Sequence, residues 1–271
     1  MNSIQAMVPS IQHALLDTHT EIFTTALTLL LREDCPPWIP PPSDIELGKL
    51  VEIVKSAIAN EFPSHKVTSM ETYCHHGQPI KPEIYIHGRM VEAMEAETTS
   101  DQNRLLLKFM AFMIIVHHIG HASVNVAYNI NPATKTTSDF PYSHCYWTSN
   151  REKSILEPGF SLEEAFLGGI VGAVFKEEQD GSPPYFLDED LAQIDYLFIH
   201  YRDGSTYRLD PAMLESWLSD QSRILTEIDV GSLEKVVTPE EIEHRTCAFF
   251  AGGLLGALNC VPGGHRSHPL N

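Results

Sequence analysis

The 271-residue chain is poor in basic residues. It has 18 Lys and Arg against 36 Asp and Glu, which gives a formal net charge of -18 at pH 7. A surface this acidic repels the phosphate backbones of nucleic acids and the headgroups of anionic membranes. The composition therefore predicts a protein with no nucleic-acid partner and no membrane partner.

Long apolar runs and regular cysteine spacings are also missing. No uninterrupted apolar run reaches about 18 residues, the length that a membrane-spanning helix needs. The five cysteines are scattered without any C-x-x-C pair, which is typical of reduced thiols rather than of a disulfide framework. Residues 1–9 contain no basic residue of the kind that opens a secretory signal. These absences predict a cytoplasmic protein, and its oligomeric state is left open.

What is present indicates one globular domain. Hydrophobic residues make up 43% of the chain and charged residues 20%, and the length suits a single core. Apolar periodicity predicts helices over 11–32 and 45–60, with Ser43 or Asp44 capping the second. We expect four parts within the domain 1–271: an N-terminal helix and Pro-rich linker over 1–43, a core over 66–175, a hairpin over 196–209 and closing helices over 211–258.

The predicted core is built around one buried helix. Residues 101–129 are apolar on all sides near their centre, which is typical of a buried helix. A long loop over 130–156 follows, and then a second apolar helix over 158–175. We predict an α+β fold, mainly helical, with one small sheet. Its strands are expected at 66–73, 83–87 and in the hairpin, and further helices at 89–97, 211–225 and 239–258.

Histidines are the residues that point to chemistry. The chain has 14 of them, and His117-His118-Ile119-Gly120-His121 lies in the predicted buried helix. His117 and His121 are four residues apart, so both imidazoles project from one helix face. Two histidines that bind one metal ion need this spacing. The alternative is that both are core histidines bonded to backbone groups or carboxylates. Because unpaired buried imidazoles are costly, the apolar surroundings favour a metal.

A second segment, Glu157 to Gly169, supplies carboxylates at the start of the next helix. Ser161 and Glu164 match a capping box, which would give Glu164 a structural role. Glu163 is then the freer of the two helix carboxylates, and the helix dipole stabilises its charge. Glu157 precedes Pro158 in extended backbone, and either Glu157 or Glu163 could reach a metal. We prefer Glu163 as the third ligand because the helix holds it rigidly, and Glu157 would then act in catalysis or orient an imidazole.

These two segments carry a resemblance to a known family. Residues 116–122 resemble the H-E-x-x-H helix of zincin metallopeptidases. Residues 157–169 resemble the E-x-G-x-x-L-E motif of a set of uncharacterised fungal zincin-like proteins, and the likeness covers about residues 80–175. The resemblance implies a zincin-like domain in which His117 and His121 are metal ligands and Glu157 or Glu163 is the third.

The chain departs from the motif at one position. His118 stands where the zincin motif has Glu, the residue that takes a proton from metal-bound water and passes it to the leaving amine. The resemblance thus implies the fold and the metal more firmly than peptide hydrolysis. We expect His118 to move protons in catalysis. The alternatives are a third nitrogen ligand, a substrate-binding group or a partly exposed neighbour without a function. His144, in the loop predicted over 130–156, is expected to contact substrate. Of the other histidines outside the motif, among them His200, we expect most to be surface or loop residues without a function.

The resulting hypothesis is a metal-dependent enzyme that has diverged from peptide hydrolysis. It would act on a small-molecule substrate through a metal-bound water or a substrate oxygen. Zinc is the expected ion, and iron is the alternative because two histidines and a carboxylate also form the facial triad of non-haem iron. Two other readings stay open: a zinc metallopeptidase with a substituted general base, and a non-catalytic zincin-like protein.

Overall fold

The computed structural model describes residues 3–33, 35, 39–60, 64–68, 83–129, 158–175, 194–201 and 205–219. The described elements are, in chain order, α1 (Ser3–His13), the π-helical turn η1 (Ala14–Thr18), α2 (Thr20–Glu33), α3 (Asp44–Asn60), β1 (Ser64–Thr68), β2 (Glu83–His87), α4 (Gly88–Glu95), α5 (Asp101–Ala127), α6 (Pro158–Leu167), β3 (Gly169–Phe175), β4 (Ile194–Tyr201), β5 (Thr206–Arg208) and α7 (Pro211–Ser219).

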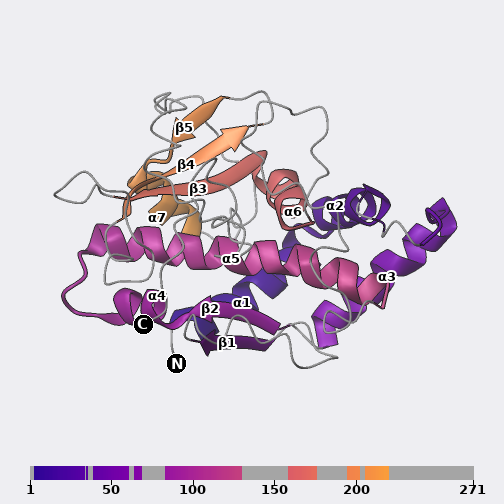
Figure 1. Cartoon of the computed structure of the whole chain (residues 1–271), viewed down its shortest axis with the longest axis horizontal. Coiled ribbons are helices and arrows are strands. Elements are labelled where there is room, and N and C mark those ends of the chain that lie inside the picture. Colours follow the sequence, from indigo (N-terminus) through magenta and orange to yellow (C-terminus); the bar gives the residue numbers. More distant parts are fainter. Residues whose placement is uncertain are drawn as a thin grey trace, which may run out of the picture.

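The long helix α5 forms the axis of the fold. It crosses the middle of the molecule, with β3, β4 and β5 on one side and β1, β2 and α4 on the other (Figure 1). Within the described residues it packs against every other α-helix. Its side chains from Leu106 to Val116 are nearly all buried, and Ser100 caps its first turn by accepting a hydrogen bond from the Asn103 amide. The predicted buried helix over 101–129 is confirmed, with its end at Ala127.

The same helix has the length and composition of a membrane span, although no uninterrupted apolar run in it reaches that length. In the structure, 78% of its most apolar 18-residue window is buried inside the protein. The core helix of a soluble protein meets the same criteria, so this feature is weak support for a span.

The strands form two separate sheets rather than the single small sheet that we expected. β1 and β2 pair in parallel, and β3, β4 and β5 form an antiparallel sheet with β4 in the centre. The mainly helical α+β prediction is confirmed. Three strands lie nearly where they were expected: β2 at 83–87, and β4 and β5 as the two strands of the hairpin predicted over 196–209. The strand predicted over 66–73 overlaps only the end of β1. The sequence pattern missed β3 altogether.

The strand β3 was not predicted because the helix predicted over 158–175 extends beyond the observed end of α6. The helix ends at Leu167, and Gly168 follows it with a φ of 78°, a left-handed conformation that glycine adopts at little cost. The Gly168 amide donates to the Glu164 carbonyl and closes the last turn. Gly169 then begins the strand. The chain therefore changes from helix to strand at one glycine.

Gly172 lies within the stretch predicted as helix and is instead part of the new strand. It lies in β3 opposite Phe198 of β4, and a Cβ at this position would overlap the Phe198 ring. The missing side chain makes room for an aromatic ring across the sheet.

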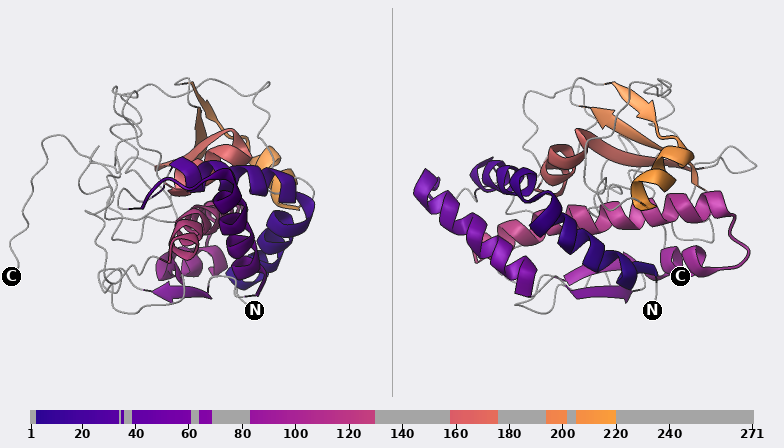
Figure 2. Two further views of the ribbon diagram at one scale, coloured as in Figure 1. Left: turned by 90° about the vertical axis from the view of Figure 1, so that its right-hand side faces the viewer. Right: turned by 180° about the vertical axis from the view of Figure 1, so that it is seen from behind.

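The N-terminal region is a layer of three helices, seen from behind in Figure 2. The predicted helix over 11–32 is divided into α1, η1 and α2, while the helix predicted over 45–60 is confirmed as α3. Ser43 caps α3. Its backbone amide and its hydroxyl donate to the Glu46 carboxylate, and the backbone amide of Glu46 donates to the Ser43 hydroxyl. The hydrogen bond from the Ser43 hydroxyl lowers the pKa of Glu46.

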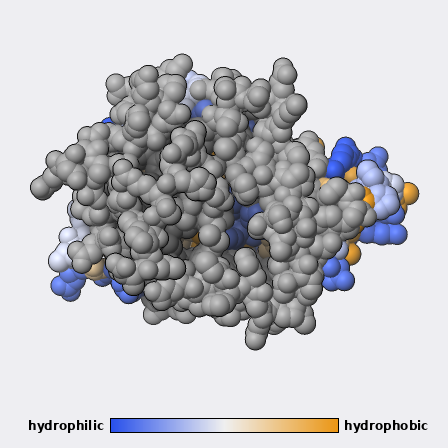
Figure 3. Space-filling model, viewed as in Figure 1, coloured by the Kyte–Doolittle hydropathy of each residue, from blue (hydrophilic) through white to orange (hydrophobic). Residues whose placement is uncertain are grey.

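Four large hydrophobic side chains stay exposed in the described part of the chain, and all lie on α2 or α3: Ile22, Leu29, Ile45 and Ile53. In the view of Figure 3, the described atoms at this end of the molecule mix hydrophilic and hydrophobic colours. The predicted linker over 36–42 is described only in part, with Ile39 half-buried. The loop predicted over 130–156 and the helix predicted over 239–258 lie outside the described residues.

Two glycines allow a matched test of the helix end at Gly168. Replacing Gly168 by Ala should lower the free energy of unfolding by about 1–2 kcal/mol, since Ala pays a steric cost in a left-handed conformation. Gly48 lies inside α3 with open space at its Cβ position. Replacing Gly48 by Ala should raise the free energy of unfolding by about 0.5–1 kcal/mol. Urea unfolding of both variants measures the difference. Changes of the same sign in both variants would contradict this account.

Candidate functional site

The expected site lies where α5 and α6 approach each other closely. A Cβ at Gly120 would collide with the Pro158 carbonyl, and a Cβ at Gly159 would collide with the His117 imidazole. Both positions thus need glycine for the two helices to pack at this distance. The close packing seals His117 between them, with 0% of its side chain exposed.

Glu163 is the buried partner of His117. One of its carboxylate oxygens, Oε1, lies 2.9 Å from Nδ1 of His117, and 1% of its side chain is exposed. The other oxygen, Oε2, accepts a hydrogen bond from the Val171 amide at 3.3 Å. A buried carboxylate is costly unless hydrogen-bond donors compensate for its lost hydration. Here the donors come from α5 and β3, so one side chain on α6 connects three elements.

His121 approaches the other nitrogen of the His117 ring. The two Nε2 atoms lie 3.3 Å apart, and His121 is half-buried. An ionised Glu163 can only accept, so Nδ1 of His117 carries the shared proton. In the neutral His117 ring, Nε2 is then an acceptor, and Nε2 of His121 donates to it. The three side chains form one chain of hydrogen bonds that leads from the buried carboxylate to a partly exposed imidazole.

Two further rings complete the surroundings. Phe160 contacts the His117 ring edge-on, with their centroids 4.9 Å apart. The ring of His118 lies 5.9 Å from that of His117 and 6.2 Å from that of His121, measured between centroids. His118 is half-buried. Three imidazoles of α5 therefore cluster, although His118 follows His117 directly and projects in a different direction from the helix axis.

The structure brings together four of the six residues that we singled out: His117, His118, His121 and Glu163. Glu157 and His144 lie outside the described residues. We expected Glu163 to bind the metal together with the two histidines. The structure places it behind His117, with its oxygens engaged at Nδ1 and at a backbone amide.

The expected capping box was wrong. α6 begins at Pro158, so Ser161 lies inside the helix and does not cap it. Proline is well suited to the first helical position because it has no amide that needs a partner there. His200 is an exception among the histidines that we expected mostly at the surface or in loops. It is buried in β4, and its Nδ1 lies 2.7 Å from the Thr206 hydroxyl of β5.

Sequence reasoning missed the residues that shape the site without reacting. Gly120, Gly159 and Phe160 set the approach of the two helices and cover His117. A glycine inside a helical pattern often indicates a close approach of another backbone or ring, and this signal was available at both positions. The Val171 amide carried no such signal because it depends on where β3 begins.

The two Nε2 atoms have a separation that suits one metal ion. A tetrahedral ion with two bonds of 2.0–2.1 Å holds its nitrogens about 3.3–3.4 Å apart, and the observed separation is 3.3 Å. Among the residues that the structure describes, no group of three or more His, Cys, Asp or Glu side chains is arranged to hold an ion. The described site thus offers two nitrogen donors, and the other positions around an ion would be taken by water, substrate or residues outside the described ranges.

Comparison of the chain with protein-family models, curated proteins and solved structures found no match.

Removing Glu163 tests its place in the fold. Glu163→Ala should lower the free energy of unfolding by about 2–6 kcal/mol, because two buried donors, at His117 and Val171, lose their acceptor at about 1–3 kcal/mol each. Glu164→Ala is the matched control on the same helix. The Glu164 side chain is only half-buried, so its loss should change the free energy of unfolding by less than about 1 kcal/mol. Urea unfolding measures both, and equal losses would contradict the role of Glu163.

Proposed function

We propose that His117 and His121 hold one divalent metal ion through their Nε2 atoms, and that the protein is a metal-dependent enzyme acting on a small-molecule substrate. One observation carries the proposal: the two Nε2 atoms lie 3.3 Å apart, with a buried carboxylate on the opposite nitrogen of His117. Two nitrogens at this distance can chelate an ion with little movement of either ring.

The position of Glu163 supports a metal site, although Glu163 is not a ligand in this proposal. Metal-binding histidines commonly donate their other ring proton to a carboxylate, which fixes the tautomer and makes the ligating nitrogen more basic. Glu163 makes this contact with His117 at 2.9 Å. In our proposal Glu163 orients His117 and does not bind the ion itself.

A divalent ion bound here would act as a Lewis acid on a substrate oxygen or a water molecule. The chain's own residues would do the rest. Glu163 keeps the proton on Nδ1 of His117, so that Nε2 stays available, and Phe160 shields this ring from water. His118, half-buried beside the pair, is positioned to hold or move a proton. Zinc is the proposed ion, and iron is the alternative because both accept imidazole ligands.

Peptide hydrolysis is the less favoured chemistry. A zincin-type mechanism relies on a carboxylate next to the first histidine of the motif, and this chain has His118 there. An imidazole differs from a carboxylate in charge and shape, so the proposal assigns the site to a small-molecule reaction.

Metal analysis of untagged protein tests the binding site. We expect about one equivalent of zinc or iron in the wild type and its loss in His117→Ala and His121→Ala, because each variant removes one of two chelating nitrogens. Glu163→Gln should keep the site but weaken metal affinity about 10–100-fold, since only the orienting partner changes. Elemental analysis and competition with a chelator measure these effects.

His13→Ala is the control, since His13 is exposed on α1 and lies outside the cluster. Far-UV circular dichroism of each variant separates loss of metal from loss of fold. If the wild type holds no metal even after reconstitution, the metal proposal is overturned, and the cluster is a buried hydrogen-bond network in a non-catalytic protein.

The reaction class is tested by restoring the carboxylate at position 118. We expect the wild type to leave a fluorogenic casein uncut and His118→Glu to gain slow, chelator-sensitive cleavage, because the variant supplies the missing general base. His118→Gln, which adds no carboxylate, should stay inactive. Chelator-sensitive cleavage by the wild type itself would instead support the peptidase alternative.

A further inference from the structure

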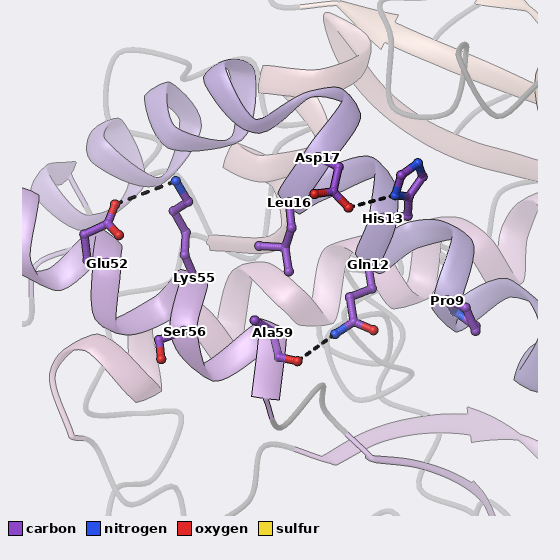
Figure 4. Close-up of a pocket in the computed structure, with 9 residues that line it drawn as sticks. All are labelled: Pro9, Gln12, His13, Leu16, Asp17, Glu52, Lys55, Ser56 and Ala59. Carbon is purple, nitrogen blue, oxygen red and sulfur yellow. Dashed lines mark hydrogen bonds and ion pairs between the residues drawn. The ribbon is translucent and has the colours of Figure 1, made fainter.

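A groove lies between the N-terminal helical segment and α3, apart from the histidine cluster. It has a volume of about 540 Å³, which falls within the size range of small-molecule sites. Residues of α1, η1 and α3 line it, among them Gln12, Leu16, Asp17, Glu52, Lys55 and Ala59. Figure 4 shows these side chains on the two facing walls.

The first wall contains the only π-helical turn in the described residues, Ala14–Thr18. Such turns are rare and often lie at functional sites, because the wider turn redirects side chains from the regular helix surface. Here the turn carries Asp17, whose Oδ2 lies 2.7 Å from Nδ1 of His13. The Asp17 side chain is 66% exposed, so a ligand can reach its carboxylate.

The second wall presents a cation. The ammonium group of Lys55 lies 3.7 Å from Oε1 of Glu52 and 3.5 Å from the Thr24 hydroxyl, and both distances are long for a hydrogen bond. Its side chain is 25% exposed, so it is partly desolvated. A partly buried ammonium with only long contacts has capacity for a closer anionic partner.

Apolar side chains line part of the groove between the charged groups, together with the polar Gln12 and Ser56. Leu16 lies between the Asp17 and Lys55 sides in Figure 4, and Ala59 lies below it. Gln12 fixes this end of the groove, because its amide donates to the carbonyls of Ile58 and Ala59 at 2.8 and 3.1 Å. The groove thus has Asp17 with His13 on one wall, Lys55 with Glu52 on the other, and the aliphatic side chains of Leu16 and Ala59 between them.

We propose that this groove binds a small zwitterion, an α-amino acid with an aliphatic side chain. Its carboxylate would pair with Lys55, its ammonium group with Asp17, and its side chain would lie on Leu16 and Ala59. A ligand with a single charge would form only one of these two charged contacts, and the other wall would keep only its present protein partner. The site uses no residue of the histidine cluster, so the proposal stands or falls independently of the metal.

Isothermal titration with L-leucine, using the whole chain, tests the proposal. We expect saturable binding with a dissociation constant of about 1 mM or tighter. Leucinamide, which lacks the carboxylate, and 4-methylpentanoate, which lacks the ammonium group, should each bind at least about tenfold more weakly because each loses one charged contact. Absence of saturable binding of L-leucine, or equal binding of all three probes, would overturn the proposal.

Two variants locate the site. Lys55→Met and Asp17→Asn should each weaken L-leucine binding at least about tenfold. Lys49→Met is the matched control, an exposed lysine of α3 outside the groove, and should bind as the wild type does. Thermal unfolding confirms that each variant is folded. Binding that survives in both Lys55→Met and Asp17→Asn would place the ligand elsewhere and overturn the assignment.

Discussion

The contact between Glu163 and His117 is the constraint on which the rest of the described site depends. Both side chains are buried, and the carboxylate oxygen lies 2.9 Å from Nδ1 of the imidazole. Because the second oxygen accepts the Val171 amide, the same side chain also holds the start of β3. A polar group so deeply buried is stable only when its partners are fixed in place. The position of α6 relative to α5 is therefore tied to the orientation of His117.

That orientation has a chemical consequence. With its proton held on Nδ1, His117 presents Nε2 to His121 at 3.3 Å, and His121 reaches partial exposure. The arrangement resembles the way in which proteins prepare histidine nitrogens for a metal, with a carboxylate behind the ligand. It is equally the end of a hydrogen-bond chain when no ion is bound. In our proposal, the metal ion takes the place of the proton that lies between the two Nε2 atoms.

Close packing makes this arrangement possible. Gly120 and Gly159 let α5 and α6 approach until backbone and ring are in contact, and Gly168 ends α6 so that β3 can begin at once. Each glycine acts at a place where a Cβ would collide or where φ is positive. The groove between η1 and α3 shows a different device, in which a π-helical turn carries an aspartate across from a lysine.

The sequence by itself determined the elements whose periodicity is strong. The apolar centre of α5, the amphipathic pattern of α3 with its Ser43 cap, and the i, i+4 spacing of His117 and His121 all depend on neighbours along the chain, so they could be predicted. Only the tertiary structure decided which nitrogen of His117 meets Glu163, and that the helix predicted past Leu167 gives way to β3. Those outcomes depend on contacts between segments far apart in the sequence: Glu163 with α5, and Gly172 with Phe198. Local propensity carries no information about such contacts. The donors that bond to a buried carboxylate, and the glycine that makes room for an aromatic ring, are brought to their partners by packing alone.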